Sequence, residues 1–135
     1  MFRKSAETRK AISLLLLCLM ASTVAGQQPA VVTFMSKALA HIPEEEGLMI
    51  TVEYPPGGAD PVHRHNAQAF VYVLEGSVVM QLKGGNELTL TPGQTFYEGR
   101  DDVHVVGRNA SLTMPAKTLV FLVKDKGAPI LVPVE

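Results

Sequence analysis

Short apolar runs separated by turn residues constrain the fold of this chain most. From residue 30 onward, the chain alternates runs such as VVTFM, LMITVEY and KTLVFLV with breakers such as PPGGADP, TPGQ and KDKGAP. Runs of this length that are rich in β-branched and aromatic residues predict strands, and the Gly, Pro, Asn and Asp between them mark chain reversals. About nine such runs without helical periodicity predict one all-β core, an antiparallel sandwich or barrel.

The first 26 residues have a different character. Four Lys and Arg residues precede the apolar run AISLLLLCLM, and small residues follow it. This order is typical of a secretory signal peptide, and the run is shorter than the about 20 residues that a membrane-spanning helix needs. We therefore expect a signal peptide at 1–26, one domain at 27–135, and a periplasmic or secreted protein without stable membrane association after cleavage. An uncleaved membrane anchor is the alternative.

Charge and cysteine content restrict the partners of the expected mature domain. The single cysteine, Cys18, lies in the apolar leader, so the mature chain would contain no disulfide and would depend on its apolar core for stability. From residue 27 onward, eight Lys and Arg stand against twelve Asp and Glu. No basic cluster is present to attract nucleic acid or anionic lipid. We expect a small-molecule ligand or substrate instead.

Two histidines one residue apart carry the clearest chemical signal. On extended backbone His63 and His65 would point to the same face, about 6.6 Å apart at Cα. Two imidazole nitrogens at that spacing can reach one ion at about 2.0–2.1 Å. His104 begins another predicted strand and is the best third ligand. The expected metal ligands are His63, His65 and His104, whereas His41, beside three glutamates, is expected at the surface in a solvated loop over 37–48.

The spacing around these histidines resembles the first conserved motif of the cupin family. The residues at the motif's intervals are Gly57, His63, His65 and Gly76. A second motif begins at Gly93 and places His104 at its histidine, whereas Ala69 occupies the place of the family's glutamate ligand. The resemblance implies a small jelly-roll β-barrel with its metal held inside by the histidines of both motifs, and usually by a glutamate.

Because a methyl group cannot coordinate a metal, Ala69 argues against the family's four-ligand site and leaves three interpretations open. The preferred one is a neutral three-histidine face, similar to that of cupin dioxygenases, with positions open for substrate and O₂. The second is a replacement ligand: Gln68, which would need a β-bulge to reach the metal, or Glu98, whose facing the sequence does not determine. The third is loss of the metal in a barrel that binds an apolar ligand.

Other side chains near the histidines are expected to line the pocket or to support the ligands. Asp101 and Asp102 are expected first of all as turn residues whose carboxylates cap local backbone N–H groups. One of them, with Asp102 as the candidate, could also accept a hydrogen bond from the far nitrogen of His104, which would orient that ring. The remaining candidates for this pocket are Ala69, Tyr72, Phe96 and Tyr97.

These interpretations lead to one preferred function and one alternative. The preferred function is that of an exported single-domain cupin that binds a divalent transition metal, Fe(II) first, with Mn, Ni or Zn as alternatives. It would act as a dioxygenase-like enzyme on a small organic substrate. The alternative is a non-catalytic protein that binds or senses a small ligand with weak or no metal. The apolar C-terminal segment APILVPVE would allow a homodimer through shared sheet edges.

Overall fold

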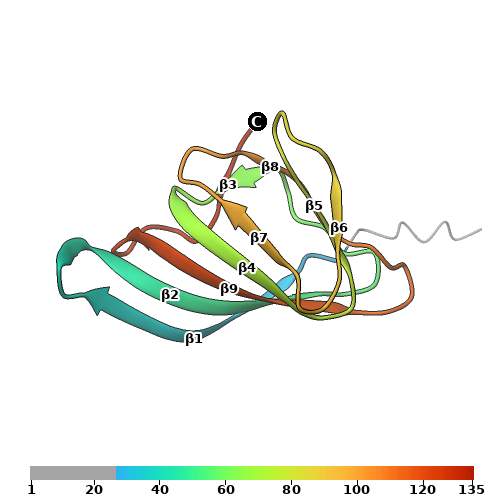
Figure 1. Cartoon of the computed structure of the whole chain (residues 1–135), viewed down its shortest axis with the longest axis horizontal. Coiled ribbons are helices and arrows are strands. Elements are labelled where there is room, and N and C mark those ends of the chain that lie inside the picture. The colour runs from blue at the N-terminus through green and yellow to red at the C-terminus, as the bar shows by residue number, and fades with distance from the viewer. Residues whose placement is uncertain (1–26) are drawn as a thin grey trace, which may run out of the picture.

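The computed structural model describes residues 27–135, so the predicted signal peptide lies outside the described residues. Ten strands form two five-stranded antiparallel sheets that face each other (Figure 1). The strands are β1 Ala30–Leu39, β2 Ile42–Tyr54, β3 His63–Arg64, β4 Ala67–Glu75, β5 Val78–Leu82, β6 Leu88–Leu90, β7 Thr95–Glu98, β8 His104–Asn109, β9 Ala116–Asp125 and β10 Val132–Pro133. The prediction of an all-β jelly roll is confirmed. Within 27–135, no helix has the length and apolarity to cross a membrane.

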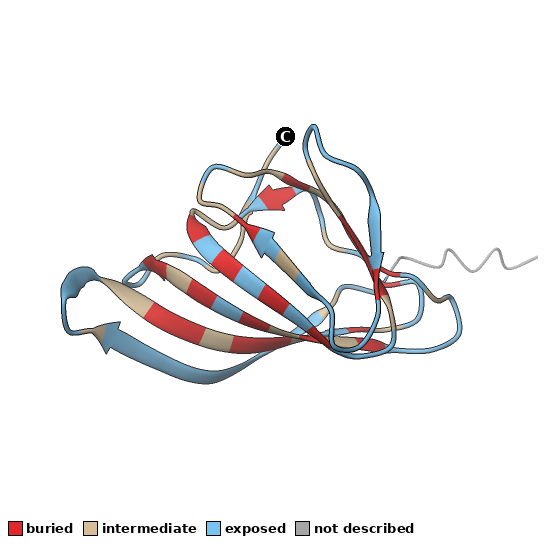
Figure 2. Cartoon of the chain, in the orientation of Figure 1, coloured by how far each residue is buried: buried red, intermediate tan, exposed pale blue. Residues whose placement is uncertain are grey.

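The first sheet has the order β1-β2-β9-β4-β7 and supplies most of the core. Buried and exposed residues alternate along β4 and β9, which appears as stripes in Figure 2. This alternation follows from the pleat, which points successive side chains to opposite faces. Ala69, Val71 and Val73 of β4 thus point into the core beside Val120 and Leu122 of β9.

The second sheet has the order β10-β3-β8-β5-β6 and closes the barrel over the first. Its core side chains include Val78 and Met80 of β5, which are almost fully buried. The turn between β4 and β5 depends on Gly76, which has a φ of 68°. A Cβ at this position would collide with the carbonyl oxygen of Pro115 and with Ala116. This glycine therefore allows the chain to pass from one sheet to the other.

The expectation of a solvated loop over 37–48 was wrong. Residues 42–46 belong to β2, which pairs with β1 on one side and, from Glu45, with β9 on the other. Glu44 is exposed to solvent, and two of the three glutamates, Glu45 and Glu46, form ion pairs with cations. Arg100 Nη2 lies 2.5 Å from Glu45 Oε1, and Lys124 Nζ lies 2.7 Å from Glu46 Oε1.

A buried asparagine holds the segment that leads from β2 toward the paired histidines. The side-chain nitrogen of Asn109 donates to the carbonyl oxygens of Tyr54, Pro55 and Met114 at 3.2, 3.1 and 2.8 Å. Its oxygen accepts a hydrogen bond from the backbone N–H of Ser111 at 2.8 Å. Buried polar groups that are fully paired in this way restrict the backbone to one conformation.

Candidate metal centre

Two cross-strand pairs, one from each sheet, bring the potential ligands together. In the second sheet, His63 of β3 lies directly opposite His104 of β8. In the first sheet, Glu98 of β7 lies directly opposite Ala69 of β4. Directly opposed residues share one face of a sheet, and all four are buried. His65 follows β3, and its ring meets the His63 ring edge to face, with 4.7 Å between the centroids.

The distances among these side chains fit one metal ion. One ligand atom from each of His63, His65, Glu98 and His104 lies within 4.8 Å of the others. Glu98 Oε2 is 3.5 Å from His65 Nε2 and 3.4 Å from His104 Nδ1. Atoms that bind one ion at about 2.0–2.2 Å are roughly 3–3.5 Å apart. Glu98 Oε2 and His104 Nδ1 are buried and have no hydrogen-bond partner within residues 27–135.

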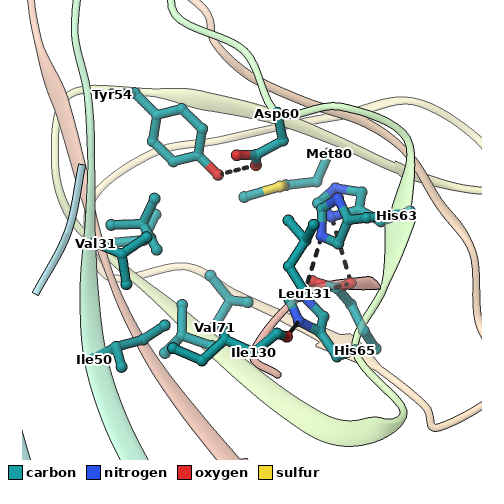
Figure 3. Close-up of a pocket in the computed structure, with 15 residues that line it drawn as sticks. Val31, Ile50, Tyr54, Asp60, His63, His65, Val71, Met80, Ile130 and Leu131 are labelled. Atoms are coloured by element: carbon teal, nitrogen blue, oxygen red, sulfur yellow. Dashed lines mark hydrogen bonds and ion pairs between the residues drawn. The ribbon is translucent and has the colours of Figure 1, made fainter. Parts of the chain in front are cut away.

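The orientation of two imidazoles indicates that a cation belongs between them. His63 Nδ1 donates to the carbonyl oxygen of Pro61 at 2.8 Å, and His65 Nδ1 donates to that of Ile130 at 2.5 Å (Figure 3). Because a carbonyl oxygen only accepts, both Nδ1 atoms carry the hydrogen, and in the neutral rings both Nε2 atoms present lone pairs. These two Nε2 atoms face each other at 3.2 Å. A bound cation would replace the repulsion between their lone pairs with attraction.

The expected neutral three-histidine face is corrected by Glu98. β7 lies beside β4, so the carboxylate comes from the residue directly opposite Ala69 on the adjacent strand. Ala69 is fully buried. The carboxylate that the first motif lacks is thus present at the site from another strand. The four groups form a set of three imidazoles and one carboxylate.

Burial sets the protonation states of the metal-free site. It raises the pKa of Glu98 to about 8, with further contributions from the negative charges of Asp60 and Asp102. It lowers the pKa of His104 to about 4, with added repulsion from His63 and His65. The pKa of His65 is lowered as well, mainly by burial. At pH 7 the metal-free site therefore holds a protonated Glu98 carboxyl group beside the neutral imidazoles of His65 and His104, and the contacts of Glu98 with these two rings are not ion pairs.

Metal binding at pH 7 is expected to release about one proton, which comes from Glu98. A carboxyl group must be ionised to bind a metal, and a pKa of about 8 keeps this one mainly protonated at pH 7. Metal affinity should therefore rise by almost tenfold per pH unit up to about pH 8. Calorimetric titration with Zn²⁺ in two buffers of different ionisation enthalpy counts the protons. A count near zero at pH 7 would show that no protonated carboxyl group becomes a ligand when the metal binds.

A cavity of about 160 Å³ lies beside the four ligands. Most of its wall is apolar, and side chains from both sheets contribute to it (Figure 3). The apolar residues include Ile50, Val71, Met80, Val120 and Leu131. Two polar side chains on this wall, Tyr54 and Asp60, were not predicted, and the Tyr54 hydroxyl donates to Asp60 Oδ2 at 2.6 Å. The sequence signal for Asp60 is its place three residues before His63, at the end of the PPGGADP turn.

Four of the predicted site residues lie elsewhere. The outer face of the first sheet exposes Gln68 and Tyr72 of β4 and Tyr97 of β7. Gln68 stays on this face because β4 is regular from Ala67 to Val73 and lacks the β-bulge that Gln68 would need to reach the metal. Tyr72 and Tyr97 line a surface groove there with Phe70 and Phe121 instead of the metal pocket. Asp102 Oδ2 accepts a hydrogen bond from the backbone N–H of Gly99 at 2.6 Å, so the predicted capping of the turn is confirmed. The additional hydrogen bond from His104 to Asp102 is not formed within residues 27–135.

Phe96, another predicted pocket residue, lies near the site without lining the cavity. It is half-buried, packs against the apolar core and lies on the same face of β7 as Glu98. Its ring centroid is 6.0 Å from that of His104. Phe96 thus supports the third histidine by packing and does not border the cavity.

The cupin domain family matches residues 50–122, more than half of the chain. The protein is therefore a member of the cupin family. The match begins in β2, ends in β9 and includes the four potential ligands. No curated protein matches the chain.

Solved structures with the same fold include proteins with different activities. TT1209 from Thermus thermophilus is 30% identical, with a TM-score of 0.58, over 72% of this chain and 84% of its own. An oxalate oxidase in complex with the substrate analogue glycolate is 25% identical, with a TM-score of 0.59, over 84% of this chain and 57% of its own. The DMSP lyase DddQ from Ruegeria pomeroyi is 20% identical, with a TM-score of 0.62, over 78% of this chain and 51% of its own. This chain thus spans about half the length of the oxidase and of the lyase. At 20% identity, the similarity to the lyase shows a shared fold only.

Proposed function

We propose that this protein is a metal-dependent oxidoreductase that acts on a small organic molecule. His63, His65, His104 and Glu98 would hold a divalent transition metal, with Fe(II) preferred and Mn, Ni or Zn as alternatives. The observation that carries the proposal is the pair of Nε2 atoms of His63 and His65, which face each other at 3.2 Å. The predicted leader places this activity in an exported protein.

The metal would supply a Lewis acid with coordination positions left open for a substrate and for O₂. The residues of this chain would do the rest. Pro61 and Ile130 orient the first two imidazoles through their carbonyl oxygens. The apolar wall formed by residues such as Val71 and Val120 would exclude water and hold the carbon skeleton of the substrate.

The comparison with known structures supports the enzyme class without defining the substrate. The oxalate oxidase is an oxidoreductase that was solved with a small oxygen-containing ligand, and its similarity extends over 84% of this chain. The four-residue ligand set of this chain is complete in spite of Ala69. The reason to prefer a metal-free binding module, the absence of a carboxylate ligand, is thereby removed.

The proposal predicts that iron-loaded protein consumes O₂ with at least one member of a panel of diketones, thiols, phenolics and small hydroxy acids. An oxygen electrode measures the uptake, and mass spectrometry identifies the product. His63→Ala should abolish the uptake, whereas His41→Ala should not, because His41 is exposed and lies outside the site. Iron-loaded protein that binds these compounds without O₂ uptake or product would support a binding protein instead.

A further inference from the structure

The end of the cavity remote from Glu98 carries polar groups that the metal does not need. Tyr54 of β2 and Asp60 lie there, joined by their 2.6 Å hydrogen bond (Figure 3). Thr118 of β9 lines the same cavity, and Tyr54 is its diagonal neighbour across these two strands. An otherwise apolar cavity thus has three hydrogen-bonding side chains in addition to the metal ligands.

The hydroxyl group of Thr118 points to a ligand. Thr118 is only 1% exposed, and its Oγ1 is buried without a hydrogen-bond partner within the described chain. A buried hydroxyl is normally paired, because leaving it unpaired costs free energy. Thr118 borders the cavity directly, so a ligand hydroxyl inside the cavity could accept the hydrogen that no residue accepts.

The volume of the cavity limits the size of the ligand. Leu122 is paired with Ala69, which in turn is paired with Glu98, and this row of residues marks the level of Glu98. Thr118 lies four residues earlier on β9 and lines another level of the same cavity. The residues between the two levels include Val71 and Val120, which are apolar. The volume of about 160 Å³ is close to that of a cavity that accommodates benzene. One small ring with short substituents would fill this space.

The charges of the wall limit the ligand further. Two carboxyl groups, Asp60 and Glu98, line the cavity, and no Lys or Arg is among its described lining residues. A doubly negative ligand would therefore have only the metal to balance its charge, next to two acidic groups. A ligand with one ionisable chelating group avoids this repulsion.

We propose that the cavity selects a neutral or singly charged oxygen chelator whose apolar ring carries a hydroxyl group at the end remote from the metal. This inference rests on the proposed metal site and names the substrate class for it. The remote hydroxyl would accept a hydrogen bond from Thr118 and donate one to the Tyr54–Asp60 pair. Oxalate, the substrate named for a relative of the same fold, does not belong to this class.

Two pyranones that differ only at the remote position test the proposal. Kojic acid carries a hydroxymethyl group opposite its chelating oxygens, and allomaltol carries a methyl group there. The protein is first titrated with Zn²⁺ and then, in the metal-loaded form, with kojic acid, allomaltol and oxalate by calorimetry. Kojic acid is expected to bind about tenfold more tightly than allomaltol, and also more tightly than oxalate.

Variants of Thr118 connect this preference to the remote end of the cavity. Thr118→Val, which keeps the shape of the side chain and removes its hydroxyl, should reduce the preference for kojic acid to a small factor. Thr118→Ser should keep most of it, and Thr95→Val on the outer face of β7 is the matched control. Equal binding of the two pyranones, or tightest binding of oxalate, by Zn²⁺-loaded protein would overturn the inference while the metal site stands. Failure of the first Zn²⁺ titration would overturn both.

Discussion

Replacement of Glu98 by glutamine is expected to weaken metal binding by at least about 100-fold. Loss of a group that only supports a ligand typically costs 10–100-fold in affinity, and Glu98 would contact the ion itself. The amide keeps the size of the side chain but removes the single negative charge of the ligand set. Calorimetric titration with Zn²⁺ measures the change. Glu87→Gln, at an exposed residue paired with Arg108, is the control.

A second pair of variants tests whether the position opposite Glu98 can supply the same carboxylate. Cross-strand partners have Cβ atoms about 4.5–5.5 Å apart, and Ala69 and Glu98 are such partners. Glu98→Ala alone should lose metal binding, and the added change Ala69→Glu should recover at least about tenfold of the lost affinity. A double variant that is folded but binds no better than Glu98→Ala would show that the two strands do not serve one site.

Saturating metal is expected to stabilise the folded protein by about 4 kcal/mol when free Zn²⁺ is about 1,000 times its dissociation constant. The stabilisation arises because the four ligands converge only in the folded state. For a domain of this size, the midpoint of thermal unfolding should rise by at least about 15 °C. Calorimetry or circular dichroism of metal-loaded and chelator-treated protein measures the shift.

Histidine variants give this stabilisation a matched control. His63→Ala should remove most of the shift, because it deletes one ligand of the site. His41→Ala should leave it unchanged, because His41 is exposed. An equal shift in both variants would mean that the metal stabilises the protein through other groups.

The all-β core could be predicted because its signals are local, whereas the jelly-roll type was implied by the resemblance to cupins. Alternation along 67–73 is a property of that segment alone, and it places Ala69, Val71 and Val73 on one face wherever the strand lies. The same alternation already disfavoured Gln68 as a ligand. The histidine spacing was equally local, since His63 and His65 are two residues apart.

The sequence named Glu98 only as one of two alternative ligands, because the direction in which its side chain points depends on pairing between distant strands. β7 has only four residues, too few for alternation to assign a face. Glu98 enters the site only because β7 pairs with β4 in the register that sets it opposite Ala69. The strand at residues 42–46 was missed for a similar reason, because two of its glutamates form ion pairs with Arg100 and Lys124 from remote segments.

We infer that one ion binds between the two sheets through both cross-strand pairs. Crystals of the Zn²⁺-loaded protein, measured at the zinc absorption edge, would locate this ion. We expect one anomalous peak about 2.0–2.2 Å from a nitrogen of His63, His65 and His104 and from an oxygen of Glu98. A peak that contacts the histidines while the Glu98 side chain turns away, or no peak among these residues, would contradict it.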